Sequence, residues 1–278
     1  MLADSSFPYT TWDDALRALD DIADPPREIL SWASANWDEA STRFLARFAE
    51  FAAGRRGSVP EAEDLYAEAF YVAHLCGEKG ETRAYPILCR LIAEDRRIAD
   101  WLDDAVTETL PGILIRVFNG DTALLRHAVE SARGDEFARS SALAALGYLV
   151  RARSAMSDAD MRAYLRRVRR DIAPCRESVL WLTWASTVAD LGYVDMRSEV
   201  AELKRDGFIP DGDFSGEEFD LRIALAQCDA SGLAGFEYDL IAPLDDATSS
   251  LLWLAGSEAA NAGLRLRAMA QRTIVDRF

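Results

Sequence analysis

Apolar side chains recur at steps of three and four residues along most of this chain, and the strict alternation that is typical of strands is nearly absent. Phe44, Phe48 and Phe51, for example, follow that spacing and would share one face of a helix. The apolar segments are short, and turn sequences such as GEKGET at 77–82 separate them. The sequence therefore predicts an all-α fold.

The helical segments come in pairs joined by short turns, a pattern that is typical of helical repeats. Residues 65–76 (LYAEAFYVAHLC) form a first segment, 83–94 form a second, and 178–206 repeat this layout. Two further pairs lie between them, at 105–132 and 137–170. First segments recur at steps close to the ~40-residue unit of HEAT and armadillo arrays. We therefore expect a HEAT/armadillo-like α-α superhelix, a short right-handed solenoid of helix pairs.

Composition divides the chain into three parts. The run GRRGSVP at 54–60 is rich in residues that leave the helical conformation, and it separates an N-terminal helical cap (1–60) from a repeat body (61–227). Residues 228–278 follow as a C-terminal connector with capping helices. Within them, 232–244 is predicted to be an irregular connector with exposed aromatic side chains. The helical stretch that ends the chain would cover the apolar face left open by the last repeat.

The charge of the chain is strongly acidic. It contains 47 Asp and Glu residues against 31 Lys and Arg residues, a net charge of −16. Affinity for nucleic acid rests largely on Lys and Arg displacing counterions from phosphates, and an acidic surface repels a phosphate backbone. Nucleic acid is therefore not expected as a partner.

Cysteine usage and hydropathy bear on the compartment. Cys76, Cys89, Cys175 and Cys228 lie far apart without C-x-x-C spacing, which favours buried thiols in a reducing compartment over disulfides. The N-terminus lacks the basic start and apolar stretch of a signal peptide. The longest apolar stretch, 179–189, is far shorter than the ~20 residues that cross a bilayer. We therefore expect a cytoplasmic protein with no membrane partner.

Four stretches carry a resemblance to a known family: AHLCGEKGETRAYPIL (73–88), TETLPGILIRVFNGD (107–121), DEFARSSALAALGYLV (135–150) and DGFIPDGDFSGEEF (206–219). In these stretches the chain resembles an uncharacterised bacterial family, domain of unknown function 1186. The resemblance implies a HEAT-like α-α superhelix and brings no established activity. Many members resemble one another in ending with a cysteine-rich zinc tail, whereas this chain has one cysteine, Cys228, and no histidine after Phe219. A partner recruited through such a tail is not expected here.

The two histidines give no catalytic pair. His74 lies two residues from Cys76, and residues two apart on a helix point about 200° away from each other, which rules out a Cys–His dyad. We expect His74 to be a partly buried side chain with satisfied hydrogen bonds. His127 is expected to be an exposed polar side chain.

Residues 211–216 (DGDFSG) imitate the start of a calcium-binding loop, with oxygen donors at alternate positions followed by glycine. The residue that should close the site with a glutamate is Arg222, which opposes a cation. We prefer a helix cap, in which Ser215 caps the next helix and Glu218 reaches back as a capping box. No metal and no cofactor are therefore expected.

Three carboxylates, those of Asp103, Asp104 and Glu108, lie on one predicted helix that Pro111 interrupts. Paired carboxylates can perform acid–base chemistry or hold a metal. No E-x-x-H motif of helical di-metal sites occurs in the sequence. We therefore expect a solvated acidic face near a helix N-terminus, where the helix dipole favours it.

One dense cationic cluster, the arginine stripe, comprises Arg162, Arg166, Arg167, Arg169 and Arg170, and most of it shares a helix face. On one interpretation, it is a solvated face that pairs with the chain's own carboxylates. On the other, it docks an acidic or phosphorylated protein, because guanidinium groups bind carboxylate and phosphate in a bidentate manner. The second interpretation makes candidate binding residues of Arg162, Arg166 and Arg170.

Charged residues also cluster beside the predicted turns between paired helices. Such residues usually join adjacent repeats through ion pairs, and the same positions border the surface that helical arrays use for ligands. They are therefore further candidate binding residues: Arg83 (next to Glu81), Asp121, Asp135 and Arg139. No G-x-x-x-x-G-K-[ST] phosphate loop and no G-x-S-x-G nucleophile elbow occurs.

Two functions stay open. The first is a non-enzymatic helical-repeat scaffold that binds a protein partner, because no nucleophile–base pair, metal-ligand set or phosphate loop is found. The alternative is an enzyme or nucleic-acid-processing protein on a HEAT-like fold, such as the helical-repeat DNA glycosylases. Trp181 and Trp184 near the arginine stripe would serve it, but the net charge disfavours it. The sequence proposes no catalytic residue and gives neither the partner's identity nor an oligomeric state.

Overall fold

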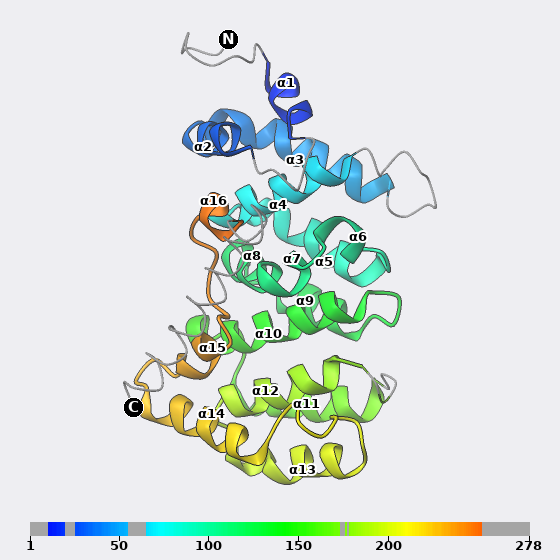
Figure 1. Cartoon of the computed structure of the whole chain (residues 1–278), viewed down its shortest axis with the longest axis vertical. Helices are drawn as coiled ribbons and strands as arrows, with labels where there is room; N and C mark the ends of the chain where they lie inside the picture. The colour runs from blue at the N-terminus through cyan, green and yellow to red at the C-terminus, as the bar shows by residue number, and fades with distance from the viewer. Residues whose placement is uncertain (1–10, 20–25, 55–64, 173–175, 177, 252–278) are drawn as a thin grey trace.

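In a computed structural model of the chain, helices stack along one long axis (Figure 1). The structure describes residues 11–19, 26–54, 65–172, 176 and 178–251. Within these ranges every element is helical and no strand occurs, which confirms the all-α prediction. One large hydrophobic core runs through the stack and extends from Ala15 to Leu251.

Three helices form the N-terminal end of the stack: α1 (Trp12–Arg17), α2 (Arg27–Ala35) and α3 (Trp37–Gly54). Thr11 caps α1, because its hydroxyl accepts the backbone N–H of Asp14. The indole rings of Trp12 and Trp32 stack with their centroids 4.4 Å apart, which joins α1 to α2.

Four helix pairs follow, each made of a first helix, a turn and a second helix. The pairs are α4 (Tyr66–Lys79) with α5 (Tyr85–Glu94), α8 (Leu110–Val117) with α9 (Thr122–Glu130), α10 (Glu136–Arg153) with α11 (Asp158–Asp171), and α12 (Leu180–Asp190) with α13 (Arg197–Arg205). Two short 3₁₀ helices, η2 (Thr82–Ala84) and η3 (Val194–Met196), precede α5 and α13. The turns are well capped: Asp121, Asp135 and Ser157 accept N–H groups in the first turns of α9, α10 and α11.

The first helices α4, α8, α10 and α12 pack against one another in that order, and α14 (Gly216–Cys228) packs against α12. Their burial explains their composition, since all residues from 138 to 150 of α10 are buried. Small residues let the helices approach closely. A Cβ atom at Gly147 would lie 2.8 Å from Cγ2 of Thr187 on α12.

The helix predicted over 105–118 is broken. The single turns α6 (Ala99–Leu102) and α7 (Ala105–Glu108) precede α8, which carries Pro111 in its first turn rather than in its interior. Proline fits there because its missing N–H has no intrahelical partner. Asp103 lies between α6 and α7 with a φ of 47°, in the left-handed region.

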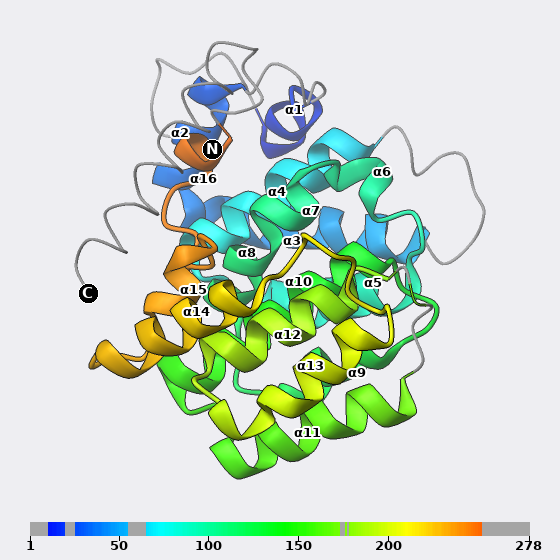
Figure 2. The ribbon, with the colours of Figure 1, turned by 60° about the horizontal axis from the view of Figure 1, so that its bottom comes forward.

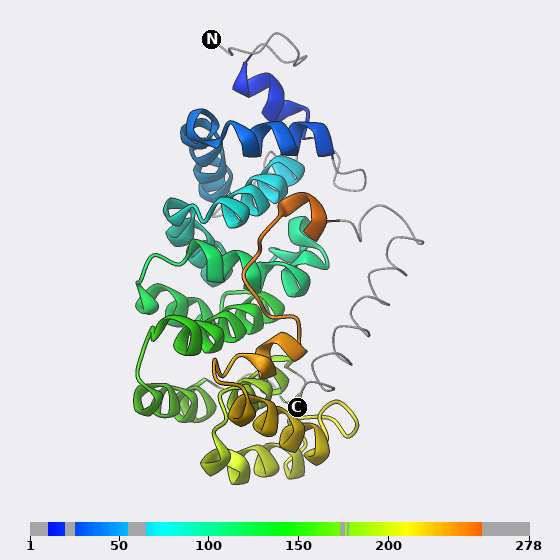
Figure 3. The ribbon, with the colours of Figure 1, turned by 90° about the vertical axis from the view of Figure 1, so that its left-hand side faces the viewer.

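After α14 the chain reverses and runs back along the side of the stack. We call residues 229–251 the return segment; it contains α15 (Ala234–Tyr238) and α16 (Ala247–Ser250). Figure 3 shows this segment crossing the stack lengthwise, from the level of α14 back toward the N-terminal helices. The C-terminal part therefore begins by lying along the side of the helix pairs. The rest of the predicted capping helices, residues 252–278, lies outside the described residues.

Two expectations for individual side chains need correction. Phe236 on α15 is fully buried, so the prediction of exposed aromatic side chains was wrong for this residue. Cys228, at the end of α14, is exposed, whereas Cys76 and Cys89 are buried thiols as predicted; Cys175 lies outside the described residues. In the part of the chain that the structure describes, no helix has the length and apolarity needed to cross a membrane.

Candidate binding face and acidic pocket

The return segment lies against the side of the stack that the first helices form, which we call the first-helix face. The N–H of Leu244 donates to the carbonyl of Gly112 in α8, with an N···O distance of 3.2 Å. Farther along, the N–H of Ala247 donates to the carboxylate of Glu78 in α4 at 3.1 Å. The segment therefore contacts first helices of two neighbouring helix pairs, α8 and α4.

Close backbone approach holds the return segment in place. A Cβ atom at Gly112 would lie 2.7 Å from the carbonyl oxygen of Ala242, so only glycine lets the segment pass this close to α8. On α15, Phe236 packs edge-on against Tyr148 of α10, with ring centroids 5.8 Å apart. These contacts position the side chains that line two pockets.

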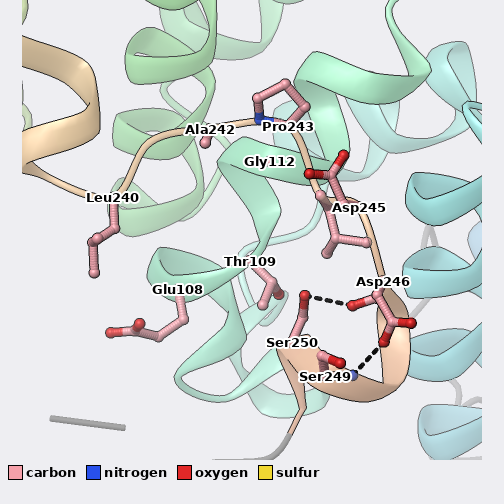
Figure 4. Close-up of a pocket in the computed structure, with 11 residues that line it drawn as sticks. Glu108, Thr109, Gly112, Leu240, Ala242, Pro243, Asp245, Asp246, Ser249 and Ser250 are labelled. Atoms are coloured by element: carbon pink, nitrogen blue, oxygen red, sulfur yellow. Dashed lines mark hydrogen bonds between the residues drawn. The ribbon is translucent and has the colours of Figure 1, made fainter. Parts of the chain in front are cut away.

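The first pocket lies between the return segment and the α7–α8 corner (Figure 4) and has a volume of about 420 Å³. Its lining includes Glu108, Thr109 and Asp246. Asp246 is committed to α16, because its carboxylate accepts the N–H of Ser249 and its backbone carbonyl accepts the hydroxyl of Ser250. The carboxylate and the backbone carbonyl of Asp246 therefore stabilise the first turn of α16.

The second pocket, of about 320 Å³, is more polar. Hydroxyl groups line much of it, from the side chains of Thr107, Ser140, Ser141, Thr183, Ser186 and Thr187. The charged residues in its lining are Asp190, Asp213, Glu218, Asp239 and Arg222. Since these are four carboxylates and one guanidinium, we call it the acidic pocket. The return segment contributes Asp239 and Ile241 to its wall.

Arg222 of α14 is the centre of the charged network in the acidic pocket. Its Nη1 lies 3.0 Å from the carboxylate of Asp190 on α12, and 2.6 Å from that of Asp239 in the return segment. Glu218, one turn before Arg222 on α14, contacts the same guanidinium at 3.1 Å. The side chains of Arg222 and Asp190 are only 4% and 2% exposed. Three carboxylates therefore share one buried cation.

This crowding changes the protonation of the network. Burial raises the pKa of Asp190 to about 7, with the Arg222 charge opposing the shift and the Asp239 charge adding to it. Burial by itself would lower the pKa of Arg222, but the surrounding carboxylates raise it above its ordinary value. Arg222 is therefore always charged, whereas Asp190 changes its protonation near neutral pH. A carboxyl group of this kind in a pocket marks a candidate functional site.

Each arginine of the stripe has a carboxylate partner. The pairs are Arg162–Asp195, Arg166–Glu199, Arg169–Glu202, Arg167–Glu130 and Arg170–Asp171. Three of these partners lie on η3 and α13, which run beside α11 (Figure 2). The guanidinium of Arg162 also lies 3.8 Å from the ring centroid of Tyr193. The stripe thus joins α11 to the η3–α13 unit and, through Arg167 and Glu130, to α9. Docking of a partner on it stays a prediction.

The candidate residues beside the turns are not brought into one site. Arg83 pairs with Glu81 at 2.7 Å, and the carboxylates of Asp121 and Asp135 cap α9 and α10. Arg139 is buried, and its Nε donates to the carbonyl of Val129 at 2.9 Å. Burial lowers its pKa, with nearby carboxylates opposing the shift. Arg83 also donates to the hydroxyl of Ser41 on α3 at 3.1 Å, whereas the other three side chains bond within or next to their own turns.

His74 is fully buried in α4 and hydrogen-bonded at both ring nitrogens. Nδ1 donates to the carbonyl of Phe70 at 2.7 Å, so in the neutral ring Nε2 accepts from the hydroxyl of Thr109 at 2.8 Å. Burial lowers the pKa of His74 to about 4. The prediction of a satisfied side chain is confirmed, although the burial is complete rather than partial. His127 is exposed, as predicted.

Two acidic patterns differ from their predictions. Asp103, Asp104 and Glu108 do not share one helix, because the chain leaves the helical conformation at Asp103. Ser215 caps α14 by accepting the N–H of Glu218 at 2.9 Å, but the capping box is incomplete because the Glu218 carboxylate binds Arg222 instead. Among the described residues, no group of three His, Cys, Asp or Glu side chains is arranged to hold a metal ion.

The tryptophans of the glycosylase alternative lie in the core. Trp184 is fully buried and donates its indole N–H to the carbonyl of Leu165 at 2.9 Å. Trp181 is 3% exposed and packs against Phe208 with ring centroids 5.3 Å apart. Neither ring can stack on a nucleobase from this position, so these two tryptophans do not support the glycosylase alternative.

Sequence reasoning missed the acidic pocket. Its residues come from helices α7, α8, α10, α12 and α14, the loop before α14 and the return segment, which are far apart in the sequence. One signal was available: Asp190 ends the apolar stretch VLWLTWASTVAD (179–190), where a carboxylate must be buried and needs a partner. The identity of that partner, Arg222, depends on packing between helices.

The chain was compared with known proteins. Residues 59–235 match the model of a family described as Protein of unknown function (DUF1186). This match spans α4 to α14, and thus all four helix pairs, which confirms the resemblance seen in the sequence. No curated protein and no solved structure matches the chain. The protein therefore belongs to the family of unknown function DUF1186.

Proposed function

We propose that this protein is a non-enzymatic scaffold whose first-helix face binds an extended segment of a partner protein. In this proposal the fold is a HEAT/armadillo-like α-α superhelix, a short right-handed solenoid of helix pairs. The observation that carries the proposal is that the chain's own return segment already lies extended on this face. A surface that accepts one extended chain has the backbone partners and the side-chain pockets for another.

The order of packing supports the solenoid. Each first helix contacts the first helix of the next pair, and the second helices α5 and α9 also contact each other. The ion pairs between α11 and the η3–α13 unit join two further repeats in the same way. Stacking in which each unit touches only its neighbours is what a solenoid requires.

The contact between the return segment and α8 combines one backbone hydrogen bond with the buried side chain of Leu244, and an extended partner segment with an apolar side chain can form both. Between α15 and α16 the segment has no helix, and among the described residues one backbone hydrogen bond, from Leu244 to Gly112, joins that stretch to the first-helix face. A partner segment can form the same bond once the return segment has moved away. We propose that the partner takes this place.

The same proposal places the protein in the cytoplasm. Cys76 and Cys89 are unpaired thiols inside the stack, and burial raises the pKa of Cys89 to about 12. A protonated, buried thiol is inert and is typical of proteins in reducing compartments.

Site-specific photo-crosslinking tests the binding face. A photoreactive amino acid replaces Thr107, which is exposed beside the first-helix face and does not belong to the return segment, or Arg170 on α11 as the control. Arg170 belongs to the arginine stripe, which is the competing docking surface, and its side chain is 73% exposed. We expect the photoreactive group at position 107 to capture a partner protein in cells and the group at position 170 not to capture it.

The outcome separates the two surfaces. Capture of a protein from position 170 but not from position 107 would contradict binding at the first-helix face and would favour the arginine stripe. In that case, reversing Arg162, Arg166 and Arg170 to glutamate should abolish the capture, because the basic surface that binds an acidic partner is lost.

A further inference from the structure

The acidic pocket holds more negative charge than its own cation can balance. Four carboxylates line it, and Arg222 is the one cationic side chain in its lining. The Arg222 guanidinium already contacts Asp190, Glu218 and Asp239. A partly buried excess of negative charge attracts any cation that can enter.

One carboxylate at the rim is available to a ligand. Asp213, in the loop before α14, is exposed, and its carboxylate has no hydrogen-bond or ion-pair partner among the described residues. The carboxylates of Glu218 and Asp239 are 30% and 29% exposed, so each also presents part of its surface to the pocket. An ammonium group between them would form charge-assisted hydrogen bonds.

A serine of α10 in the lining of the acidic pocket indicates a ligand independently. Ser140 on α10 is 6% exposed, and its hydroxyl has no hydrogen-bond partner among the described residues. Buried hydroxyl groups are normally bonded to protein, water or a bound molecule. Because Ser140 lines the acidic pocket, its hydroxyl can turn about χ1 to meet a molecule inside it.

The dimensions and the remaining wall limit the ligand. The volume of about 320 Å³ is at the lower end for small-molecule sites, which suits a metabolite rather than a folded partner. The wall carries six hydroxyl-bearing side chains. Those of Thr107 and Ser141 donate to backbone carbonyls and can still accept a hydrogen bond, whereas the others can both donate and accept. A ligand with several hydroxyl groups matches this wall better than an alkyl chain does.

We propose that the acidic pocket binds a small organic cation that carries a primary ammonium group and several hydroxyl groups. The ammonium group contacts Asp213, Glu218 and Asp239, and the hydroxyl groups contact Ser140 and the neighbouring serines and threonines. This site does not depend on the protein-binding function proposed above. Because Asp239 belongs to the return segment, a bound cation also holds that segment against the first-helix face.

Calorimetric titration of the intact protein with three matched sugars tests the charge preference. Glucosamine carries an ammonium group, glucose is neutral, and glucuronate carries a carboxylate on the same ring. At a pH where the amine is protonated, we expect saturable binding of glucosamine, binding of glucose at least tenfold weaker, and no binding of glucuronate. 1,4-Diaminobutane, a cation without hydroxyl groups, should bind more weakly than glucosamine.

Variants locate the binding. Asp213→Asn should weaken glucosamine binding about tenfold, because one charge-assisted contact is lost. Ser140→Ala should weaken it severalfold without lowering thermal stability, since its hydroxyl has no protein partner to lose. Asp245→Asn removes the same charge from the wall of the neighbouring pocket and should leave binding unchanged.

Three results would overturn the proposal. They are the absence of glucosamine binding to the intact protein, binding of glucose or glucuronate as tight as that of glucosamine, and equal weakening by Asp213→Asn and Asp245→Asn. Tighter binding of 1,4-diaminobutane than of glucosamine would support a cation site but contradict the role given to the hydroxyl wall. Protection of the return segment from hydrogen exchange by glucosamine gives a second, independent readout.

Discussion

The backbone N–H of Leu244 donates to the carbonyl of Gly112, and a Cβ atom at Gly112 would lie 2.7 Å from the carbonyl oxygen of Ala242. Gly112 is thus the point at which α8 and the return segment come closest. Gly112→Ala should push the segment away while α8 persists, because alanine is a good helix former. We expect faster amide hydrogen exchange in residues 239–251, measured by mass spectrometry.

Gly216→Ala is the matched control for that experiment, because a Cβ atom there meets no other atom within 4 Å. It should leave exchange in the return segment at the wild-type rate. If Gly112→Ala also left that rate unchanged, the segment would not lie against α8 as described.

Removing the central cation of the acidic pocket should lower the free energy of unfolding strongly. Arg222→Met leaves the buried carboxylate of Asp190 without its partner, a change that typically costs about 3–5 kcal/mol. Arg166→Met breaks an exposed pair with Glu199 and should cost less than about 1 kcal/mol. Urea unfolding of both variants measures the difference. Equal losses of stability would show that the Arg222 network is not buried.

His74 should make the fold sensitive to acid. The pKa of His74 is about 4 in the folded protein against an ordinary value of 6.5, so the unfolded chain binds the extra proton first. Stability from this residue is present above pH 6.5 and falls as the pH drops toward 4, by up to about 3 kcal/mol. In His74→Gln, this part of the pH dependence should disappear, whereas the exposed control His127→Gln should keep it. Unfolding free energies across that pH range give the comparison.

Asp190 should make the folded protein less stable as the pH rises, which is opposite to the effect of His74. Its pKa is raised to about 7, so the folded protein binds the proton more tightly than the unfolded chain does. The groups that face it are Arg222, Glu218 and Asp239. The contribution of Asp190 to stability is complete below pH 3.8 and is lost as the pH rises through about 7. Asp190→Asn should therefore be more stable relative to wild type at pH 8 than at pH 5. A relative stability that does not change with pH would contradict the shift.

Much of the fold could be predicted from local sequence. The apolar period predicted the helix pairs, and Asp121, Asp135 and Ser215 cap helices as their residue type indicates. The sequence did not predict the break at Asp103. Its positive φ occurs at an aspartate and not at a glycine, the residue that usually indicates this backbone conformation.

The candidate site could not be predicted in the same way. From the sequence, Arg222 was interpreted only as a residue that opposes calcium binding. Glu218 was interpreted only as part of a capping box. Their roles depend on Asp190 and Asp239, which the reversal of the chain after α14 brings to the same place. Pairing across such a reversal leaves no periodic signal in the sequence.

Photo-crosslinking in the Gly112→Ala variant tests the central claim, that a partner segment replaces the return segment on the first-helix face. Because the added Cβ atom would lie 2.7 Å from the carbonyl oxygen of Ala242, this variant weakens the contact of the return segment with α8. Capture of the partner from position 107 is compared in wild type, Gly112→Ala and the control Gly216→Ala. The account predicts more capture by Gly112→Ala than by wild type and no change in Gly216→Ala. Capture that is unchanged or weaker in Gly112→Ala would contradict it.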